Sequence, residues 1–362
     1  MKNTKLKFLV MLLAGLMVLN QAYSQDKESI LLKDYKPVSI FKIPVTNIQK
    51  AKYPIIDMHA HDYAKTPEEA DVWVKKMDSL GIQKTIILTG RTGQAFDAIV
   101  TKYSKHPERF DIWCGFDYSG FDQPGWTEKA VAELERCKKA GAKGVGEISD
   151  KGQGITRSKD DPANGMHIDD PRMKPLLEKC ADLGLPINIH VADPIWAYLP
   201  IDNKNDGLMS AFNWRIDMGK PGMYNHGQLI QTLERAVREN PRTTFIACHL
   251  ANCDFDLSIL GNLLDKYPNL HTDISARFYQ TATIPRHTRE FYQQYSNRIL
   301  YGTDMSTEMN MYRWTLRVLE SADEHFYFRY TYHWPMYGLN LDSDLLKKMY
   351  HENAQKILEL LK

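Results

Sequence analysis

Eight short apolar segments alternate along this chain with segments that carry helix signals, and this alternation constrains the fold more than any other feature. A parallel sheet covered by helices produces such a pattern, because each strand is connected to the next through a helix. Eight repeats predict an α/β fold in a single domain, the (β/α)8 TIM-like barrel. The segments expected as strands are 54–59, 85–88, 110–116, 142–147, 186–190, 243–248, 270–274 and 298–303.

The residues between the expected strands support this arrangement. Thr66 can cap a helix that begins at Pro67, and Gly141 and Gly184 stand where helices commonly end. An open doubly wound sheet is the alternative, but no glycine-rich dinucleotide fingerprint follows the first strand. The closed barrel is therefore favoured.

Two connections are too long to be simple turns, residues 149–169 after the fourth strand and residues 191–225 after the fifth. Both leave the face of the barrel where catalytic loops lie, so we expect them to form a lid and substrate walls. A solvated insertion that merely covers the barrel end is the alternative. Trp196 and Trp214 in the second connection are candidate substrate-binding residues, and they suit a ring-bearing or sugar-like ligand.

The amino terminus has the organisation of a secretory signal peptide. Lysines at 2, 5 and 7 precede an apolar stretch over 8–19, and small residues follow, which places cleavage after Ser24. An uncleaved membrane anchor is the alternative, but so short a stretch spans a bilayer poorly. We therefore expect an exported, most simply periplasmic protein without a membrane span after cleavage. Residues 25–52 are a polar lead-in that wraps the barrel, which occupies 53–362.

Charge and cysteine content exclude several other classes of protein. Lys and Arg number 46 against 45 Asp and Glu, so no charge excess indicates nucleic acid or a membrane surface as partner. The five cysteines form no Cys-x-x-Cys pair, and their odd number leaves at least one thiol unpaired. Cys114 and Cys248 fall inside expected strands and are interpreted as core residues. A small-molecule substrate is the expected partner, and a homo-oligomer is possible.

Side chains that can bind a metal stand at, or just beyond, the ends of the expected strands. Alternate residues of a strand point the same way, so His59 and His61 can chelate one ion. In a parallel barrel the strand ends converge on one face, which predicts a metal-dependent enzyme. A lone histidine is usually structural, but five strand ends with a ligand-capable residue are not a coincidence. The set is His59, His61, Glu147, His190, His249 and Asp304.

The mixture of imidazole nitrogen and carboxylate oxygen suits zinc, with manganese or iron as alternatives. A divalent ion lowers the pKa of bound water from about 15.7 towards about 7. Asp304 can take the proton from that water and pass it to a leaving group, although an aspartate here could also cap the next helix. His249 could hydrogen-bond the water, polarise the substrate or complete a second metal site.

Glu147 decides between one ion and two, because a carboxylate on the fourth strand can bridge two ions. Pairing with Lys143 as a buried structural carboxylate is the alternative. Arg91 after the second strand and Arg277 after the seventh are further candidate substrate-binding residues, since guanidinium groups bind carboxylates. Ordinary surface ion pairs are the alternative for both arginines.

The chain resembles the amidohydrolase superfamily, in particular the amidohydrolase-2 branch with aminocarboxymuconate-semialdehyde decarboxylase-like enzymes and lactone hydrolases. The likeness runs from Asp57-Met58-His59-Ala60-His61 through Gly302-Thr303-Asp304 to Asn353-Ala354-Gln355. It implies metal ligation by the two histidines of the first motif, by His190 and by Asp304, with His249 as a catalytic histidine near the water.

Gly146-Glu147-Ile148 departs from that branch, which is often mononuclear, and resembles the bridging Glu of TatD-like metal hydrolases.

Three functions follow as hypotheses. The first is hydrolysis of a small-molecule ester, lactone, amide or related bond, which the expected export favours. The second is non-oxidative decarboxylation of a carboxylic acid with the same metal and Asp304. The third is a catalytically inactive barrel that binds a small molecule, but the complete set of candidate metal-binding residues makes this function less favoured.

Overall fold

The computed structural model describes residues 28–156, 165–327 and 334–359 of the chain. Eight parallel strands form its centre, three in one sheet and five in a second, and within each sheet neighbouring strands pair in the order of the chain. The strands are β1 Ile55–Ala60, β2 Ile82–Leu88, β3 Phe110–Trp113, β4 Val145–Asp150, β6 Ile187–Val191, β7 Phe245–Ala247, β8 Leu270–Asp273 and β9 Ile299–Leu300.

Two sets of backbone hydrogen bonds join these two sheets into a closed barrel. The Gly146 amide of β4 donates to Cys114 O, directly after β3, at 2.8 Å. The Met58 amide of β1 donates to Tyr301 O, directly after β9, at 3.0 Å. The predicted barrel is therefore confirmed, with eight strands near the predicted positions.

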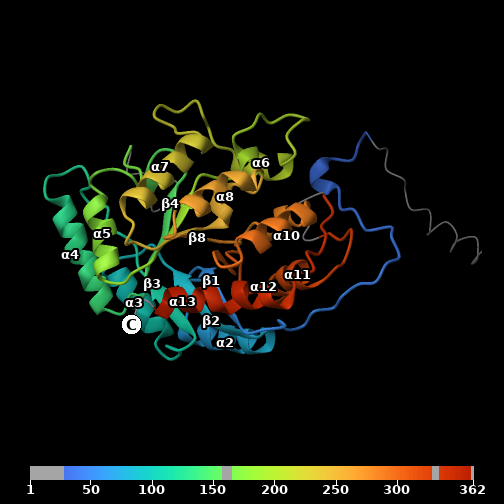
Figure 1. Ribbon diagram of the computed structural model, residues 1–362, viewed down its shortest axis with the longest axis horizontal. Coiled ribbons are helices and arrows are strands. Elements are labelled where there is room, and N and C mark those ends of the chain that lie inside the picture. The colour runs from blue at the N-terminus through green and yellow to red at the C-terminus, as the bar shows by residue number, and fades with distance from the viewer. Residues whose placement is uncertain (1–27, 157–164, 328–333, 360–362) are drawn as a thin grey trace, which may run out of the picture.

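Helices cover the outside of the barrel, as Figure 1 shows. Thr66 caps the first of them with its side chain, and Asn225 forms a capping box with Gln228, so polar residues fix where these helices begin. The helices after successive strands are α2 Pro67–Leu80, α3 Gly93–Tyr103, α4 Trp126–Lys139, α5 Lys174–Asp182, α7 His226–Glu239, α8 Leu257–Lys266, α10 Pro285–Gln294 and α11 Met309–Glu320.

The core has two parts. Strands and surrounding helices bury one large apolar cluster between them, whereas a smaller cluster with members from β1, β2, β3, β7 and β9 fills the barrel interior. Ala354 and Ile357 of α13 (Asn353–Glu359) belong to the interior cluster, together with Ile56 near the start of β1. The end of the barrel where the strands begin is thus covered, and the opposite end is left for a site.

Several predicted boundaries were wrong. β4 begins and ends three residues later than predicted, because Ser149 and Asp150 pair with the short antiparallel β5 (Ile155–Thr156) and with β6. Glu147 therefore lies within a strand and not at its end. The connection after β6 contains a helix, α6 Leu208–Trp214, which was not predicted. After the last strand the described part of the chain ends in α12 (Ser343–Lys347), a π-helical turn over Lys348–Glu352, and α13.

The predicted signal peptide, residues 1–24, lies outside the described residues. The described lead-in is largely exposed and runs along the edge of the molecule (Figure 1), where the Thr46 hydroxyl donates to Asp323 Oδ1 at 2.6 Å. Within the described ranges, no helix combines the length and apolar character needed to cross a membrane. All five cysteines are buried and unpaired, which confirms the interpretation of Cys114 and Cys248 as core residues.

Candidate metal centre

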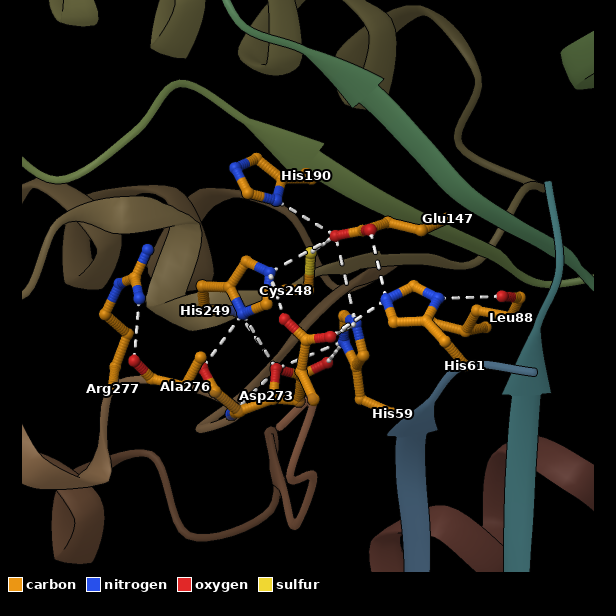
Figure 2. Close-up of polar contacts among 12 residues, drawn as sticks. His59, His61, Leu88, Glu147, His190, Cys248, His249, Asp273, Ala276 and Arg277 are labelled. Atoms are coloured by element: carbon orange, nitrogen blue, oxygen red, sulfur yellow. Dashed lines mark hydrogen bonds and ion pairs between the residues drawn. The ribbon is translucent and has the colours of Figure 1, made fainter. Parts of the chain in front are cut away.

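The structure brings the six predicted side chains together at the open end of the barrel. Glu147 is their common neighbour, and Figure 2 shows four imidazoles directed at its carboxylate, those of His59, His61, His190 and His249. Oε1 lies 3.0 Å from His190 Nδ1 and 3.2 Å from His249 Nε2, and Oε2 lies 3.5 Å from His61 Nε2. The Cys248 thiol, which sequence reasoning placed only in the core, lies 3.3 Å from Oε1.

Asp304 approaches the same histidines from the other side of the cluster. Its Oδ1 lies 2.8 Å from His61 Nε2 and 3.5 Å from His59 Nε2, and its Oδ2 lies 3.6 Å from His249 Nε2. The donor atoms form two groups, and His59 belongs to both. Within each group, all donor atoms lie within 4.8 Å of one another. One adds Glu147, Cys248 and His249, and the other adds His61 and Asp304.

Unusual backbone conformations present two of these side chains. His249 opens a turn in which four successive residues have φ between 52° and 60°, and Asp304 has φ 54°. Left-handed backbone costs a residue with a side chain roughly 1–2 kcal/mol, so other contacts must hold it. The His249 amide donates to Asp273 Oδ1 at 3.0 Å, and the Asp304 amide donates to His59 O at 2.9 Å. Such over-determined backbone is typical of functional sites.

Backbone carbonyls fix the orientation of two imidazoles. His61 Nδ1 lies 2.9 Å from Leu88 O, and His249 Nδ1 lies 2.9 Å from Ser275 O. Because a carbonyl oxygen only accepts hydrogen bonds, each Nδ1 carries a hydrogen and donates it. In the neutral imidazole the remaining nitrogen, Nε2, then offers a lone pair to the centre of the cluster.

Carboxylates orient the other two imidazoles. His59 Nδ1 donates to Asp273 Oδ2 at 3.0 Å, and both side chains are fully buried. His190 presents its nitrogens the other way round: Nε2 lies 3.2 Å from Asp193 Oδ1, and Nδ1 lies 3.0 Å from Glu147 Oε1. All four histidines therefore bind an acceptor on the outside of the cluster and turn their second nitrogen inward.

The inward nitrogens and the two carboxylates fit a metal cation. Lone pairs of neutral imidazoles face carboxylate oxygens, and two acceptors at such distances repel each other unless a proton or a metal ion lies between them. His59 Nε2 is buried and makes no hydrogen bond with any part of the chain that the structure describes. Imidazole nitrogen with carboxylate oxygen is a donor set for zinc, manganese or iron.

Burial and neighbouring charges shift the pKa values of the cluster residues in opposite directions. Burial lowers the pKa of His59, but the carboxylates of Asp304 and Asp273 outweigh it and raise this pKa to about 10. Burial raises the pKa of Asp304, yet the neighbouring histidines bring it down to about 2. Burial also raises the pKa of Glu147, but the neighbouring His190 outweighs it and holds the pKa of that carboxyl well below its usual range. Both carboxylates are therefore ionised at neutral pH.

A cavity of about 380 Å³ opens on one side of the cluster, where His190, His249 and Asp304 form part of its wall. Trp196 and Trp214 line it, which is where the sequence placed substrate walls. The predicted substrate residue Arg277 lines it as well, but its guanidinium is engaged by the protein. Nη1 donates to the Ala276 carbonyl at 2.7 Å, and Nε donates to Asn252 Oδ1 at 3.0 Å.

A second cavity, of about 220 Å³, lies on the other side and includes His61, Glu147 and the fourth predicted substrate residue, Arg91. The structure thus places every predicted site residue at the cluster or in a cavity beside it. Sequence reasoning missed the orienting residues Asp273 and Ser275. Asp273 stands one residue before the end of the strand predicted over 270–274, close to where the ligands stand on theirs, and that position was the available signal; in the structure it ends β8.

Comparisons with known proteins agree with the fold. An amidohydrolase family model matches residues 46–360. The solved 2,6-dihydroxybenzoate decarboxylase from Rhizobium has 16% identity and a TM-score of 0.55, covering 85% of this chain and 99% of its own. A 5-carboxyvanillate decarboxylase from Novosphingobium aromaticivorans, solved with manganese and a nitrobenzoic acid, has 14% identity and a TM-score of 0.51, covering 87% and 100%.

An uncharacterised TIM-barrel protein from Bordetella bronchiseptica is similar to the same extent, with 16% identity, a TM-score of 0.56 and coverage of 85% and 99%. No curated protein matches this chain. The structural likenesses, all at low identity, support the barrel fold alone.

Proposed function

This chain belongs to the amidohydrolases, in the amidohydrolase-2 branch of metal-dependent enzymes, and from that premise we propose that it is a hydrolase of small molecules. The bond cleaved is an ester, lactone, amide or related bond. His59, His61, His190 and Asp304 would hold a divalent metal ion, and Glu147 would bridge it to a second ion. Zinc is the metal that we propose, because its preferred donors are those of the cluster.

One observation carries the proposal: the outer nitrogen of each histidine lies against an acceptor, so that the inner nitrogen faces the place where a metal would bind. The orienting contacts are those to Leu88 O, Asp273, Asp193 and Ser275 O. Outer partners of this kind fix the tautomer and the ring orientation of metal-binding histidines. Glu147 adds a carboxylate at the centre of the cluster, which favours two ions and hydrolysis.

The residues of the chain can perform the remaining chemistry. A divalent ion bound here would supply a lower pKa for bound water and polarisation of the bond to be cleaved. Asp304 is ionised, so it can accept a proton from the attacking water and donate it to the leaving atom. It also lines the larger cavity, so its carboxylate would lie beside a substrate bound there. His249 lines the same cavity. Burial lowers the pKa of His249, so its imidazole is neutral and can orient the water.

Decarboxylation is the second candidate, and Arg277 is the observation that favours it. Arg277 lines the cavity that also contains Asp304, and a substrate carboxylate bound between the two would compete with the contacts of the guanidinium to Ala276 O and Asn252 Oδ1. Two decarboxylases of benzoic acids share the fold. Asp304 would then take a proton from water and pass it to the ring carbon, and loss of carbon dioxide would follow in place of water attack on a carbonyl.

Product analysis with purified protein separates the two reactions. Metal content is first measured by elemental analysis, and 4-nitrophenyl hexanoate and 2,6-dihydroxybenzoate are then supplied separately in ¹⁸O-labelled water. The proposed hydrolase releases hexanoate that carries one ¹⁸O atom, and it loses this activity in a chelator and regains it with zinc. Release of carbon dioxide from the benzoate, without ester cleavage, would support the decarboxylase and overturn the hydrolase.

We also propose that the protein is exported, on the basis of the charged, apolar and small residues in succession over 1–24. The expected mature chain begins at Gln25. Mass spectrometry of the protein from a periplasmic extract checks this, and an intact Met1 in a cytoplasmic fraction would contradict it.

A further inference from the structure

Two cavities open on the metal-binding cluster from opposite halves of the barrel. The first, called here the polar cavity, is formed by His61, by the segments after β2 and β3, and by β4. The second, called the aromatic cavity, is formed by segments that follow β6, β7, β8 and β9, with α6 above them. Because the strands succeed one another around the barrel, these segments stand on opposite sides of its mouth. The metal-binding cluster lies between the two cavities.

The polar cavity contains two charged groups, the Glu147 carboxylate of the metal-binding cluster and the Arg91 guanidinium. Arg91 is exposed at its wall, and no carboxylate in the described parts of the chain forms an ion pair with its guanidinium. The backbone that carries Arg91 is fixed, since its amide donates to Thr89 Oγ1 at 3.0 Å and its carbonyl accepts from the Gly115 amide at 2.8 Å. A guanidinium in this position is suited to a carboxylate or another anion.

Cations beside the aromatic cavity are, by contrast, already paired. Lys151 Nζ lies 2.9 Å from Asp193 Oδ1, and Arg277 Nε lies 3.7 Å from Asp254 Oδ1. An added anion would compete there with a buried carboxylate, whereas at Arg91 it would meet an unpaired charge. The negative end of a substrate is therefore expected on the Arg91 side.

Large apolar side chains dominate the wall of the aromatic cavity. Trp196, Met209 and Met305 can offer a ring and polarisable sulfur to a ligand. The wall also includes Tyr279 and Trp214, and Lys151 Nζ lies 5.1 Å from the centre of the Trp214 ring. Trp196 Nε1 is buried and has no hydrogen-bond partner among the described residues, so it could donate to a polar substituent of a bound ring.

We propose that the substrate has two parts, an apolar ring that occupies the aromatic cavity and a short anionic chain that reaches Arg91. An ester or amide bond joins them over the metal-binding cluster. This inference rests on the proposed hydrolase function and names the substrate class for it. Water adds its oxygen to the carbonyl carbon, the bond to the leaving oxygen or nitrogen breaks, and the proton from water passes through Asp304 to the leaving atom. The products are a dicarboxylic acid and a phenol or an aromatic amine.

Two esters of equal chain length test the anionic end. We expect the metal-loaded enzyme to cleave 4-nitrophenyl hydrogen hexanedioate with a kcat/KM about tenfold above that for 4-nitrophenyl hexanoate. Arg91→Met should bring this ratio close to one, and Arg91→Lys should restore part of it. Arg238→Met removes an exposed charge from α7 and serves as the matched control that keeps the wild-type ratio. A ratio near one in the wild type, or one that Arg91→Met does not change, would overturn the inference.

A second pair of esters tests the ring. Trp196→Leu should lower kcat/KM for 4-nitrophenyl hexanoate about fivefold more than for ethyl hexanoate, since only the first substrate places a ring against the indole. Phe212→Leu, an exposed position of α6 outside the cavity wall, is the matched control. Equal losses for the aryl and the alkyl ester would contradict a ring site in the aromatic cavity.

Calorimetry separates failure of this inference from failure of the hydrolase proposal. Hexanedioate and 4-nitrophenol are titrated alone and together into the metal-loaded protein. We expect simultaneous binding, with hexanedioate weakened about tenfold by Arg91→Met and 4-nitrophenol unaffected. If no ester is cleaved but both compounds bind together, the hydrolase proposal fails, whereas the anion site at Arg91 and the ring site in the aromatic cavity are supported. Mutually exclusive binding would overturn the two-part substrate even in an active hydrolase.

Discussion

Asp273 holds His59 through a hydrogen bond from Nδ1 to Oδ2 of 3.0 Å, and neither side chain is exposed to solvent. The same carboxylate accepts the amide of His249 through Oδ1 at 3.0 Å and a short hydrogen bond from the Ser275 hydroxyl. One buried residue that is not among the proposed ligands therefore orients two histidines of the cluster. This arrangement makes Asp273 a positioning residue for the metal site.

Substitution of Asp273 should weaken metal binding without removing a ligand. We expect Asp273→Asn to lower the affinity for zinc by about ten- to a hundredfold, because the acceptor that orients His59 loses its charge. Competition with a chromophoric chelator measures this affinity. Asp256→Asn, at the exposed cap of α8, is a matched control. Wild-type affinity in Asp273→Asn would contradict the positioning role.

His59→Ala and Asp304→Asn should each abolish turnover and leave the barrel folded. The site stands at the open end, whereas the interior cluster of apolar residues and the covering helices hold the fold. Activity, metal content and circular dichroism are to be measured together. A variant that keeps the normal rate and metal content would show that the substituted side chain is not part of the site.

Glu147→Gln tests the number of ions. Glu147 belongs to one donor group and Asp304 to the other, so we expect two ions per wild-type chain. The amide is a poor bridge between cations, and elemental analysis of the variant should find one ion. If wild type and variant bind the same number of ions, Glu147 orients histidines and does not bridge.

Much of this architecture could be predicted because strand ends in a barrel share one face, so His59, His190 and Asp304 had to converge. The outer partners could not be predicted in the same way. Ser275 O reaches His249 only through the left-handed turn after β7, a conformation that has no clear sequence signal. Pairing with β5 lengthens β4 and places Glu147 within the strand, which the apolar pattern alone does not reveal.

Glu133 should make stability depend on acid pH at a place remote from the site. Hydrogen bonds from Arg136 lower the pKa of Glu133 to about 2 from an ordinary value near 4.5. A carboxyl whose pKa is depressed by folding stabilises the protein above its unfolded pKa and loses this contribution as pH falls towards its folded pKa. Glu133→Gln should therefore cost about 1 kcal/mol at pH 7 and progressively less below about pH 4.5.

Urea unfolding between pH 7 and pH 3 measures this contribution. Glu128→Gln on the exposed side of the same helix is the control and should change stability little at any of these pH values. A difference between wild type and Glu133→Gln that stays constant with pH would show that the carboxylate does not stabilise the native state through its charge.

Metal uptake by the stripped protein should release protons. Without an ion, the carboxylates of Asp304 and Asp273 raise the pKa of His59 to about 10 against the opposing effect of burial, so its imidazole is protonated at pH 7. A metal ligand must be deprotonated, and zinc therefore has to displace that proton. We expect at least about one proton released per chain, and a zinc affinity that falls as pH falls. Titration calorimetry in buffers of different ionisation enthalpy counts the protons. An observed binding enthalpy independent of the buffer would show that His59 is neutral before the metal binds. His59 Nε2 would then face the carboxylates of Glu147 and Asp304 without a proton.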